Sequence, residues 1–278
     1  MIERPADGEE RGAILLVHGA SGNATDMFAA LADPLAAAGF RVLSPDRPGH
    51  GWSGRIGGED GMSPSLQARA LRQAAEQLGV ADAVVAAHSL GALIGLALAL
   101  DHRDFVRALV LIAPVSHPWP GGVAWFYRLG AHPFLGPPFR RLVSLPVGLL
   151  WMRAAVAGVF APNRPPQNFV AATRLKLVLR PLHFRANCED VAHAEAAVAA
   201  LSPRYCSIRA PTEIVTGDSD AIVSARIHSE GLKRDVPGAR LTILKAVGHS
   251  PHYVAPARIV EIILAAERRA SQPATETA

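Results

Sequence analysis

A serine stands at the tip of a sharp turn between an apolar run and a helical run. Residues 83–100 read AVVAAHSLGALIGLALAL, with strand character before His88 and helical character after Gly91. A serine in such a turn is held on a strained backbone, and its hydroxyl is exposed above the sheet. The pattern predicts that Ser89 is a nucleophile. The alternative is an ordinary strand-to-helix turn with a capping serine.

Small residues must flank a nucleophile in this turn. The usual pattern has glycine two positions before the serine and two after it, whereas this chain has Ala87 and Gly91. We expect the extra methyl group of Ala87 to be tolerated, because the position requires a free backbone more than it excludes bulk.

A serine hydroxyl is a poor nucleophile until a histidine accepts its proton, and a carboxylate must orient that histidine. Both groups should follow later strands, in the chain order serine, acid, histidine. His249 directly follows Gly248 at a predicted strand end, which favours it over His252 as the base. Asp220 and Asp218 both follow the preceding predicted strand, and spacing alone leaves the choice of acid open.

Two backbone N–H donors are needed for the oxyanion that forms during acyl transfer. Leu90 directly follows the serine and is predicted to supply one donor. Ala20, in the turn His18-Gly19-Ala20 after an early strand, is predicted to supply the other. We interpret His18 and His88 as structural histidines beside these turns.

Strands and helices must alternate to bring these turns to one edge. Buried strands are predicted at 13–17, 40–43, 83–88, 106–112, 213–216 and 240–244. Helices are predicted from Thr25 or Asp26 to Gly39, and at 64–78, 90–100, 189–201, 224–233 and 256–268. The alternation predicts an α/β fold, with a mostly parallel central sheet and helices on both faces.

The alternation is interrupted at 114–185, which is rich in aromatic residues and proline. Short helices broken by proline turns are expected there, forming an inserted helical cap. The domain prediction is a core of 1–113 with 186–270, a cap at 114–185 and a disordered tail at 271–278. Trp125, Phe126 and Tyr127 are candidates for a substrate pocket, although aromatic residues at helical spacing also occur in plain cores.

Composition excludes several classes of partner. The 278 residues are 50% apolar with a net charge of +4, and the basic residues are scattered without a nucleic-acid stripe. The two cysteines have no metal-ligand spacing, and no cofactor or metal is predicted. The polar N-terminus and the absence of an apolar run of about 18 residues predict a soluble, cytoplasmic protein that acts on a small molecule.

Five motifs in order, VHGASGN, SPDRPGHGWS, AAHSLGA, TGDSDAIV and VGHSPH, resemble the α/β-hydrolase superfamily over nearly the whole chain. The resemblance implies that Ser89 is the nucleophile, Asp220 rather than Asp218 the acid, and His249 the base. It also implies oxyanion donors at Ala20 and Leu90, and a helical cap after the sixth family strand. The closer resemblance is to capped bacterial hydrolases of esterase type.

The family usually begins with a β-hairpin, for which only about a dozen residues are present before Ala13. We expect either that these edge strands are missing or that the native chain starts further upstream. Membrane contact, through an apolar anchor, is expected only in the second case.

The nucleophile type narrows the expected reaction. Dehalogenases and epoxide hydrolases of the superfamily use aspartate where Ser89 stands, so cleavage of a carboxylic ester through an acyl-enzyme is the first expectation. Thioester hydrolysis or carbon-carbon cleavage would use the same residues. A non-catalytic binding module is the alternative from another class, although such modules typically lose a member of the triad.

Overall fold

The computed structural model describes residues 1–272 and contains one seven-stranded sheet, whose order is β1-β3-β2-β4-β5-β6-β7. All neighbouring strands are parallel except β1 and β3, so the predicted mostly parallel sheet is confirmed. The strands are β1 (Ile2–Arg4), β2 (Ala13–Val17), β3 (Arg41–Ser44), β4 (Ala83–His88), β5 (Val106–Ile112), β6 (Thr212–Gly217) and β7 (Arg240–Leu244).

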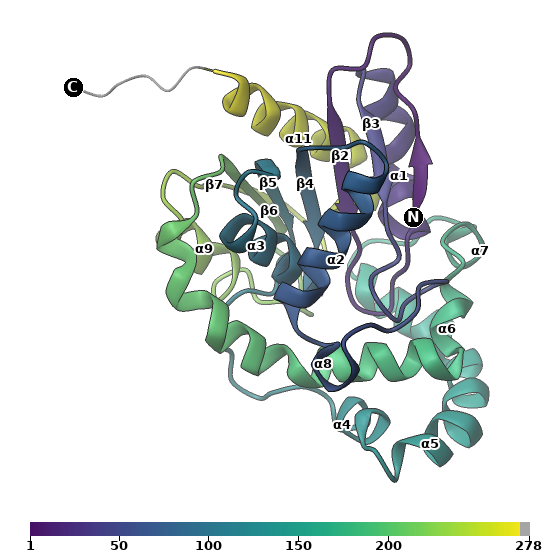
Figure 1. Ribbon diagram of the computed structural model, residues 1–278. Helices are drawn as coiled ribbons and strands as arrows, with labels where there is room; N and C mark the ends of the chain where they lie inside the picture. The colour runs from purple at the N-terminus through teal and green to yellow at the C-terminus, as the bar shows by residue number, and fades with distance from the viewer. Residues whose placement is uncertain (273–278) are drawn as a thin grey trace.

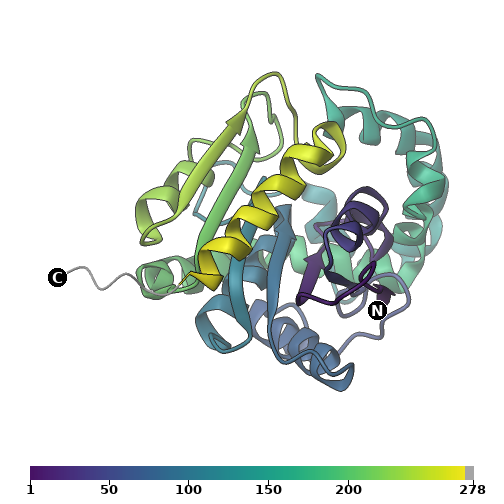
Figure 2. The same cartoon turned by 90° about the horizontal axis from the view of Figure 1, so that it is seen from above.

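Helices cover both faces of the sheet (Figures 1 and 2). Apolar side chains of α1 (Thr25–Ala37) and α11 (Pro256–Ser271) pack on one face. Those of α2 (Pro64–Gln77), α3 (Ala92–Asp101) and α9 (Ser229–Asp235) pack on the other, together with α8 (Pro181–Leu201). The short remaining elements of this part are η1 (Gly58–Asp60), η2 (Ser89–Gly91), η5 (Ser202–Ser207) and α10 (Pro251–Val254).

Strand β2 is apolar throughout because both of its faces are covered. In β2, Leu15 and Val17 join the cluster beneath α2 and α3, whereas Ile14 and Leu16 join the cluster beneath α1 and α11. Successive side chains of a strand point to opposite faces, so a strand covered on both sides can be apolar at every position. Ala87 pairs with Val17 and with Leu111, which aligns the carboxyl ends of three central strands.

Helices also form most of the chain between β5 and β6, and we call residues 114–185 the cap. They are α4 (Trp125–Ala131), α5 (Gly136–Phe139), η3 (Arg140–Ser144), α6 (Leu145–Phe160), α7 (Phe169–Ala172) and η4 (Leu175–Leu179), followed by α8. The cap has a small apolar cluster of its own around Met152, Val156 and Phe160. Because α8 runs unbroken from Pro181 to Leu201, the predicted boundary at 185/186 falls inside a helix.

Three local expectations are corrected. An antiparallel edge strand, β1, lies within the first dozen residues, and its three residues were too few and too polar to be recognised. The helix expected from Ser224 begins at Ser229, because 221–228 form turns in which Asp220 accepts two backbone hydrogen bonds. Neither Thr25 nor Asp26 caps α1, since the side chains of Asn23 and Asp46 accept its first amides.

Two further points concern the ends and the apolar helices. Of the tail predicted at 271–278, position 271 ends α11, and residues 273–278 lie outside the described residues. Within residues 1–272, no single helix is long and apolar enough to cross a membrane. The pair Gly136–Leu142 and Leu145–Phe160 reaches that length and apolarity together, with a bend of 71° between its members.

Candidate active site

Ser89 lies at the turn between β4 and α3 with a backbone φ of +52°. A positive φ is costly for a residue with a side chain, so the surrounding structure must hold it in place. The methyl group of Ala87, which stands where the usual motif has glycine, faces Gly95 on α3. A Cβ added at Gly95 would lie 3.0 Å from the Cβ of Ala87, so glycine at position 95 leaves room for the methyl group of Ala87.

Gly91 allows the turn to approach the loop that follows β2. A Cβ at Gly91 would lie 2.4 Å from the carbonyl oxygen of His18 and 2.7 Å from that of Val17, distances that no real side chain tolerates. Glycine at this position therefore brings the serine turn and the His18-Gly19-Ala20 turn together.

Ser89, His249 and Asp220 form one chain of hydrogen bonds. The Oγ of Ser89 lies 2.9 Å from Nε2 of His249, and Nδ1 of His249 lies 2.7 Å from Oδ2 of Asp220. The Asp220 side chain is fully buried, and its Oδ1 accepts hydrogen bonds from the amides of Ile222 and Val223. With an ionised carboxylate, Nδ1 of His249 carries the proton, which leaves Nε2 free to accept the serine proton.

Asp218, the other candidate acid, does not contact His249. It is exposed, and its Oδ1 accepts a hydrogen bond from the amide of Ala246 at 2.8 Å. Asp218 thus joins the loop after β6 to the loop after β7 by a hydrogen bond to Ala246, not to the histidine.

The His249 loop is also tied to the cap through Asn163. The Asn163 side chain donates to the carbonyl of Ala246 at 2.9 Å and accepts from the amide of Gly248 at 2.9 Å. The amide of His249 itself donates to the carbonyl of Val159 at 3.3 Å. We call Asp220, His249 and the side chains that hold their loops the base side of the site. Nothing in the sequence near Asn163 indicates these contacts.

The loop that carries Ala20 is held by Asn187 of α8. Oδ1 of Asn187 accepts from the amide of Ser21 at 2.6 Å, and its Nδ2 donates to the hydroxyl of Ser21 at 3.2 Å. Ala20 and Leu90, the predicted oxyanion donors, line the same cleft as Ser89. We call this loop and its supports the oxyanion side.

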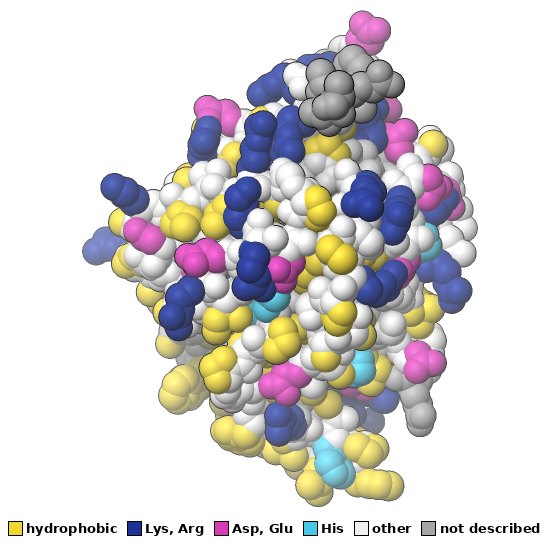
Figure 3. Space-filling model, turned by 90° about the vertical axis from the view of Figure 1, so that its left-hand side faces the viewer, with side chains coloured by type: hydrophobic (Ala, Val, Ile, Leu, Met, Phe, Trp, Pro, Cys, Tyr) yellow, Lys and Arg dark blue, Asp and Glu magenta, His cyan; other side chains and the backbone are white. Residues whose placement is uncertain are grey.

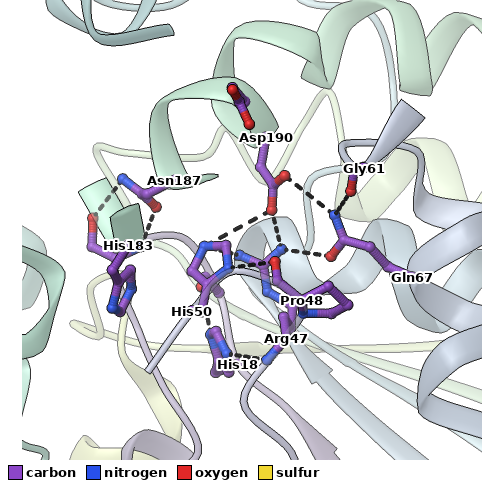
Figure 4. Close-up of polar contacts among 12 residues, drawn as sticks. His18, Arg47, Pro48, His50, Gly61, Gln67, His183, Asn187 and Asp190 are labelled. Carbon is purple, nitrogen blue, oxygen red and sulfur yellow. Dashed lines mark hydrogen bonds and ion pairs between the residues drawn. The ribbon is translucent and has the colours of Figure 1, made fainter. Parts of the chain in front are cut away.

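A buried polar network lies behind the oxyanion side (Figure 4). Arg47, which is fully buried, donates to Oδ2 of Asp190 at 2.6 Å, to the side chain of Gln67 at 3.2 Å and to the carbonyl of Gly19 at 3.2 Å. The amide of Arg47 also donates to Nε2 of His18 at 3.0 Å. The network therefore connects the oxyanion loop to the loop after β3, to α2 and to α8.

The titratable groups of this network are shifted by burial. Burial and the Arg47 charge hold the pKa values of His18 and His50 well below the usual histidine range. The same two causes lower the pKa of His183 to about 4. Burial also lowers the pKa of Arg47 itself, although the Asp190 carboxylate opposes this shift. These three histidines are neutral at pH 7, so Arg47 supplies the positive charge that Asp190 balances.

A second group of histidines lies beneath His249. The rings of His88 and His252 are 4.5 Å apart, and donor atoms of both lie within 4.8 Å of an Asp26 oxygen, close enough to hold a cation. Nε2 of His88 lies 2.9 Å from the carbonyl oxygen of His249 and donates to it, and Nδ1 has no hydrogen-bond partner among the described residues. Burial holds the pKa of His88 well below its usual range.

Two apolar cavities meet at Ser89. The larger, of about 900 Å³, passes between Trp119, Tyr127 and Val191. The smaller, of about 270 Å³, extends toward Val156 and Phe169 of the cap. Both are lined by Ala20, Ser89, Tyr127 and Ile222.

Of the three aromatic residues expected in the pocket, only Tyr127 lines these cavities. The expectation is corrected for Trp125 and Phe126, which are absent from both linings. The short helix α4 presents Tyr127 to α8 and the cleft, whereas the Trp125 side chain is 70% exposed on the outside. The sequence predicted aromatic side chains on a helix but did not show which of them would face Ser89.

Comparison with known proteins gives one family and several relatives. A family model described as alpha/beta hydrolase fold matches residues 12–256. A pimeloyl-[acyl-carrier protein] methyl ester esterase from Aromatoleum aromaticum is 31% identical over 253 residues, which cover 86% of this chain and 91% of that protein.

Two solved structures illustrate the similarity in fold. The enol-lactonase from Burkholderia xenovorans has a TM-score of 0.75 at 20% identity, covering 95% of both chains. A thermophilic esterase from Thermogutta terrifontis has a TM-score of 0.67 at 20% identity, covering 98% of this chain and 94% of its own. At these identities the likeness concerns the fold.

Proposed function

The chain belongs to the alpha/beta hydrolase fold family, and on that premise we propose that it cleaves carboxylic esters of small or medium apolar substrates through an acyl-enzyme on Ser89. The observation that carries the proposal is the continuous hydrogen-bonded chain from Ser89 through His249 to the buried Asp220.

In the first half of the reaction, His249 accepts the proton of Ser89 as the hydroxyl oxygen attacks the ester carbonyl. Asp220 keeps the imidazole in the required tautomer and stabilises the imidazolium that forms. Collapse of the tetrahedral intermediate transfers the proton to the leaving alcohol and leaves the acyl group on Ser89. A water molecule activated by His249 then attacks the acyl-enzyme and releases the acid.

The oxyanion that forms in each half-reaction needs donors in place before the attack. We assign these donors to the amides of Ala20 and Leu90, because both residues line the cleft at Ser89. A single donor of this kind contributes about 3–4 kcal/mol to transition-state stabilisation in serine proteases. Asn187 and Arg47 hold the loop of Ala20, so we assign them positioning roles.

The apolar lining of both cavities supports an apolar substrate with groups on either side of the scissile bond. Known relatives point the same way, because one acts on a methyl ester by its description and a structural neighbour is an enol-lactonase. Thioesters and carbon-carbon bonds remain alternatives that the same triad could attack, and a substrate panel separates them.

A fluorophosphonate probe tests the nucleophile. We expect the wild-type protein to be labelled and Ser89→Ala to remain unlabelled, with equal folded fractions by circular dichroism. A folded wild-type protein that is not labelled would instead favour a non-catalytic binding module on this fold.

A nitrophenyl ester series of rising acyl length tests the pocket. Tyr127→Ala should change the dependence of kcat/KM on acyl length, because Tyr127 lines both cavities. Trp125→Ala is the matched control, since this neighbouring aromatic side chain lines neither cavity. Equal profiles for the two variants and the wild type would contradict the proposed pocket.

A further inference from the structure

Charge is distributed unevenly between the cap and the rest of the chain. Residues 114–185 contain nine Lys and Arg and no Asp or Glu, whereas the remainder contains 19 basic and 24 acidic residues. The modest net charge of +4 thus conceals a strongly basic cap on an acidic core. The basic residues look scattered in the sequence because they are far apart along the chain and seldom adjacent.

Several of the cap's basic side chains are not neutralised. Five exposed ones form no hydrogen bond or ion pair with any part of the chain between residues 1 and 272. They are Arg141, Arg153, Arg164, Arg174 and Lys176. Surface cations that serve only solubility are usually interspersed with anions, and here the anions are absent.

The same region exposes most of the molecule's large apolar side chains. Fifteen are strongly exposed in the described chain, and ten of them are in the cap. They are Trp125, Phe134, Leu135, Leu142, Leu145, Val147, Leu149, Leu150, Trp151 and Leu182. Figure 3 shows hydrophobic side chains gathered at the lower edge of the molecule, the edge at which α4 and α5 lie in Figure 1.

Helix α6 explains how the exposure arises. Its 16 residues include a single arginine and are otherwise uncharged, yet only Met152, Val156 and Phe160 are buried, a stripe with a spacing of four residues. On the remaining surface Leu150 is 79% and Trp151 63% exposed. A helix that packs on a core with one apolar stripe normally carries polar residues on its other faces. The outer face of α6 carries exposed apolar side chains instead.

A groove beside α6 combines both properties. It has a volume of about 990 Å³ and is lined by apolar residues together with Arg153, Arg174 and Lys176. Val156 and Phe169 line this groove and also the smaller cavity at Ser89, so the two spaces are separated by a shared wall.

We propose that the outer face of the cap, formed by α4 to α7, docks on the surface of an anionic lipid bilayer. Exposed Trp, Phe and Leu side chains enter the headgroup region, and unpaired Arg and Lys side chains bind lipid phosphates, the combination typical of interfacial helices. The absence of acidic residues from the cap sequence removes the repulsion that would otherwise oppose docking. This docking needs no upstream anchor, and it does not depend on which bond Ser89 attacks.

Vesicle co-sedimentation of the full chain tests the proposal. We expect binding to phosphatidylcholine vesicles that contain phosphatidylglycerol, weaker binding to pure phosphatidylcholine, and release by salt because the lipid charge is screened. The triple variant Arg153→Gln, Arg174→Gln, Lys176→Gln should lower partitioning about 100-fold, since each basic side chain near an anionic membrane contributes about fivefold.

A matched control separates the cap from net charge. The triple variant Arg69→Gln, Arg103→Gln, Arg268→Gln removes three exposed cations from the core that pair with nothing in residues 1–272, and it should bind like the wild type. Leu150→Gln with Trp151→Gln should also weaken binding, while fluorophosphonate labelling of all variants reports an intact fold. Absence of binding to the anionic vesicles, or equal loss in both triple variants, would overturn the proposal. So would a stable dimer in sedimentation velocity that Leu150→Gln with Trp151→Gln dissociates, because a second copy would then cover the face.

Discussion

The base side and the oxyanion side of Ser89 are built in different ways. On the base side, Asp220 and His249 follow adjacent strands. Asp218 and Asn163 accept hydrogen bonds from backbone amides of the His249 loop and hold that loop in place. On the oxyanion side, the loop of Ala20 is supported by a fully buried ion pair, Arg47 with Asp190, whose members are 143 positions apart. The base side depends on hydrogen bonds between loops at the strand ends, whereas the oxyanion side depends on a buried ion pair.

The difference predicts how each side fails. A change on the base side should remove activity while leaving the fold intact, because its groups orient His249 and a neutral replacement leaves no charge buried without a partner. A change in the oxyanion network should lower stability first, because it leaves a charge buried without its partner. Five measurements test this contrast.

Asp220→Asn should have the largest effect. The amide can no longer hold His249 in the tautomer that accepts the serine proton, and kcat should fall about 10⁴-fold with little change in Tm. Asp218→Asn should change kcat far less, because Asp218 contacts Ala246 and not the histidine. Ester hydrolysis by the two variants decides the matter, and the reverse ranking would overturn the choice of acid.

Asp190→Leu should be the most destabilising change. It leaves the fully buried Arg47 without its carboxylate, which should lower the free energy of unfolding by about 3–5 kcal/mol. Urea denaturation measures the loss, and the double variant with Arg47→Met should recover part of it. An unchanged urea midpoint for Asp190→Leu would show that the oxyanion side does not rest on this pair.

Stability should fall as the pH is lowered from about 6.5 toward about 4. The pKa values of His18, His50 and His183 are lowered in the folded protein, that of His183 to about 4, so the unfolded chain binds more protons in this window. Urea midpoints between pH 7.5 and 4.5 measure the slope, and His183→Gln should make it shallower. A flat profile would contradict the buried neutral histidines.

Asn187→Ala and Asn163→Ala compare two side chains that hold the loops of the site, Asn187 from α8 and Asn163 from the cap. Each removes hydrogen bonds worth about 1–3 kcal/mol in context, so kcat should fall about 10–100-fold in either case. Loss of Asn187 should affect kcat with little change in KM, since the oxyanion forms only in the transition state. If KM rises and kcat is unaffected, Asn187 serves substrate binding and not the oxyanion loop.

Ala87→Gly should have the smallest effect. Removing the methyl group opposite Gly95 leaves a small void, and activity should stay within about twofold of wild type. Gly95→Ala provides the contrast, because its Cβ would meet that of Ala87 at 3.0 Å and should lower Tm. A large loss of activity in Ala87→Gly would mean that the methyl group shapes the serine turn.

The same contrast explains what could be predicted from the sequence. The strands, the turn at Ser89 and the positions of Asp220 and His249 after later strands follow from local patterns, namely apolar runs, glycines and chain order. The choice between Asp218 and Asp220 rested on family resemblance. Both residues lie in one turn, and only the direction of their side chains, which the sequence does not reveal, distinguishes them.

The supports of the site could not be predicted because they are non-local. Nothing near Arg47 indicates that Asp190 will be its partner, and nothing near Asn163 or Asn187 indicates a contact with loops of the core. The orientation of α4, which turns Tyr127 inward and Trp125 outward, likewise depends on packing against α8. Edge strand β1 escaped notice because three mostly polar residues carry no periodic signal.

Helix α8 has a consequence for how this protein can change over evolutionary time. Its first turns belong to the cap and its later turns to the core, and between them it carries both Asn187 and Asp190. Exchange of the cap together with the whole of α8 for those of a relative would therefore replace part of the support for the oxyanion loop. Viable recombinants should have their downstream crossover before Asn187, so that new specificities arise by substitution within α4 to α7 while α8 is inherited with the core.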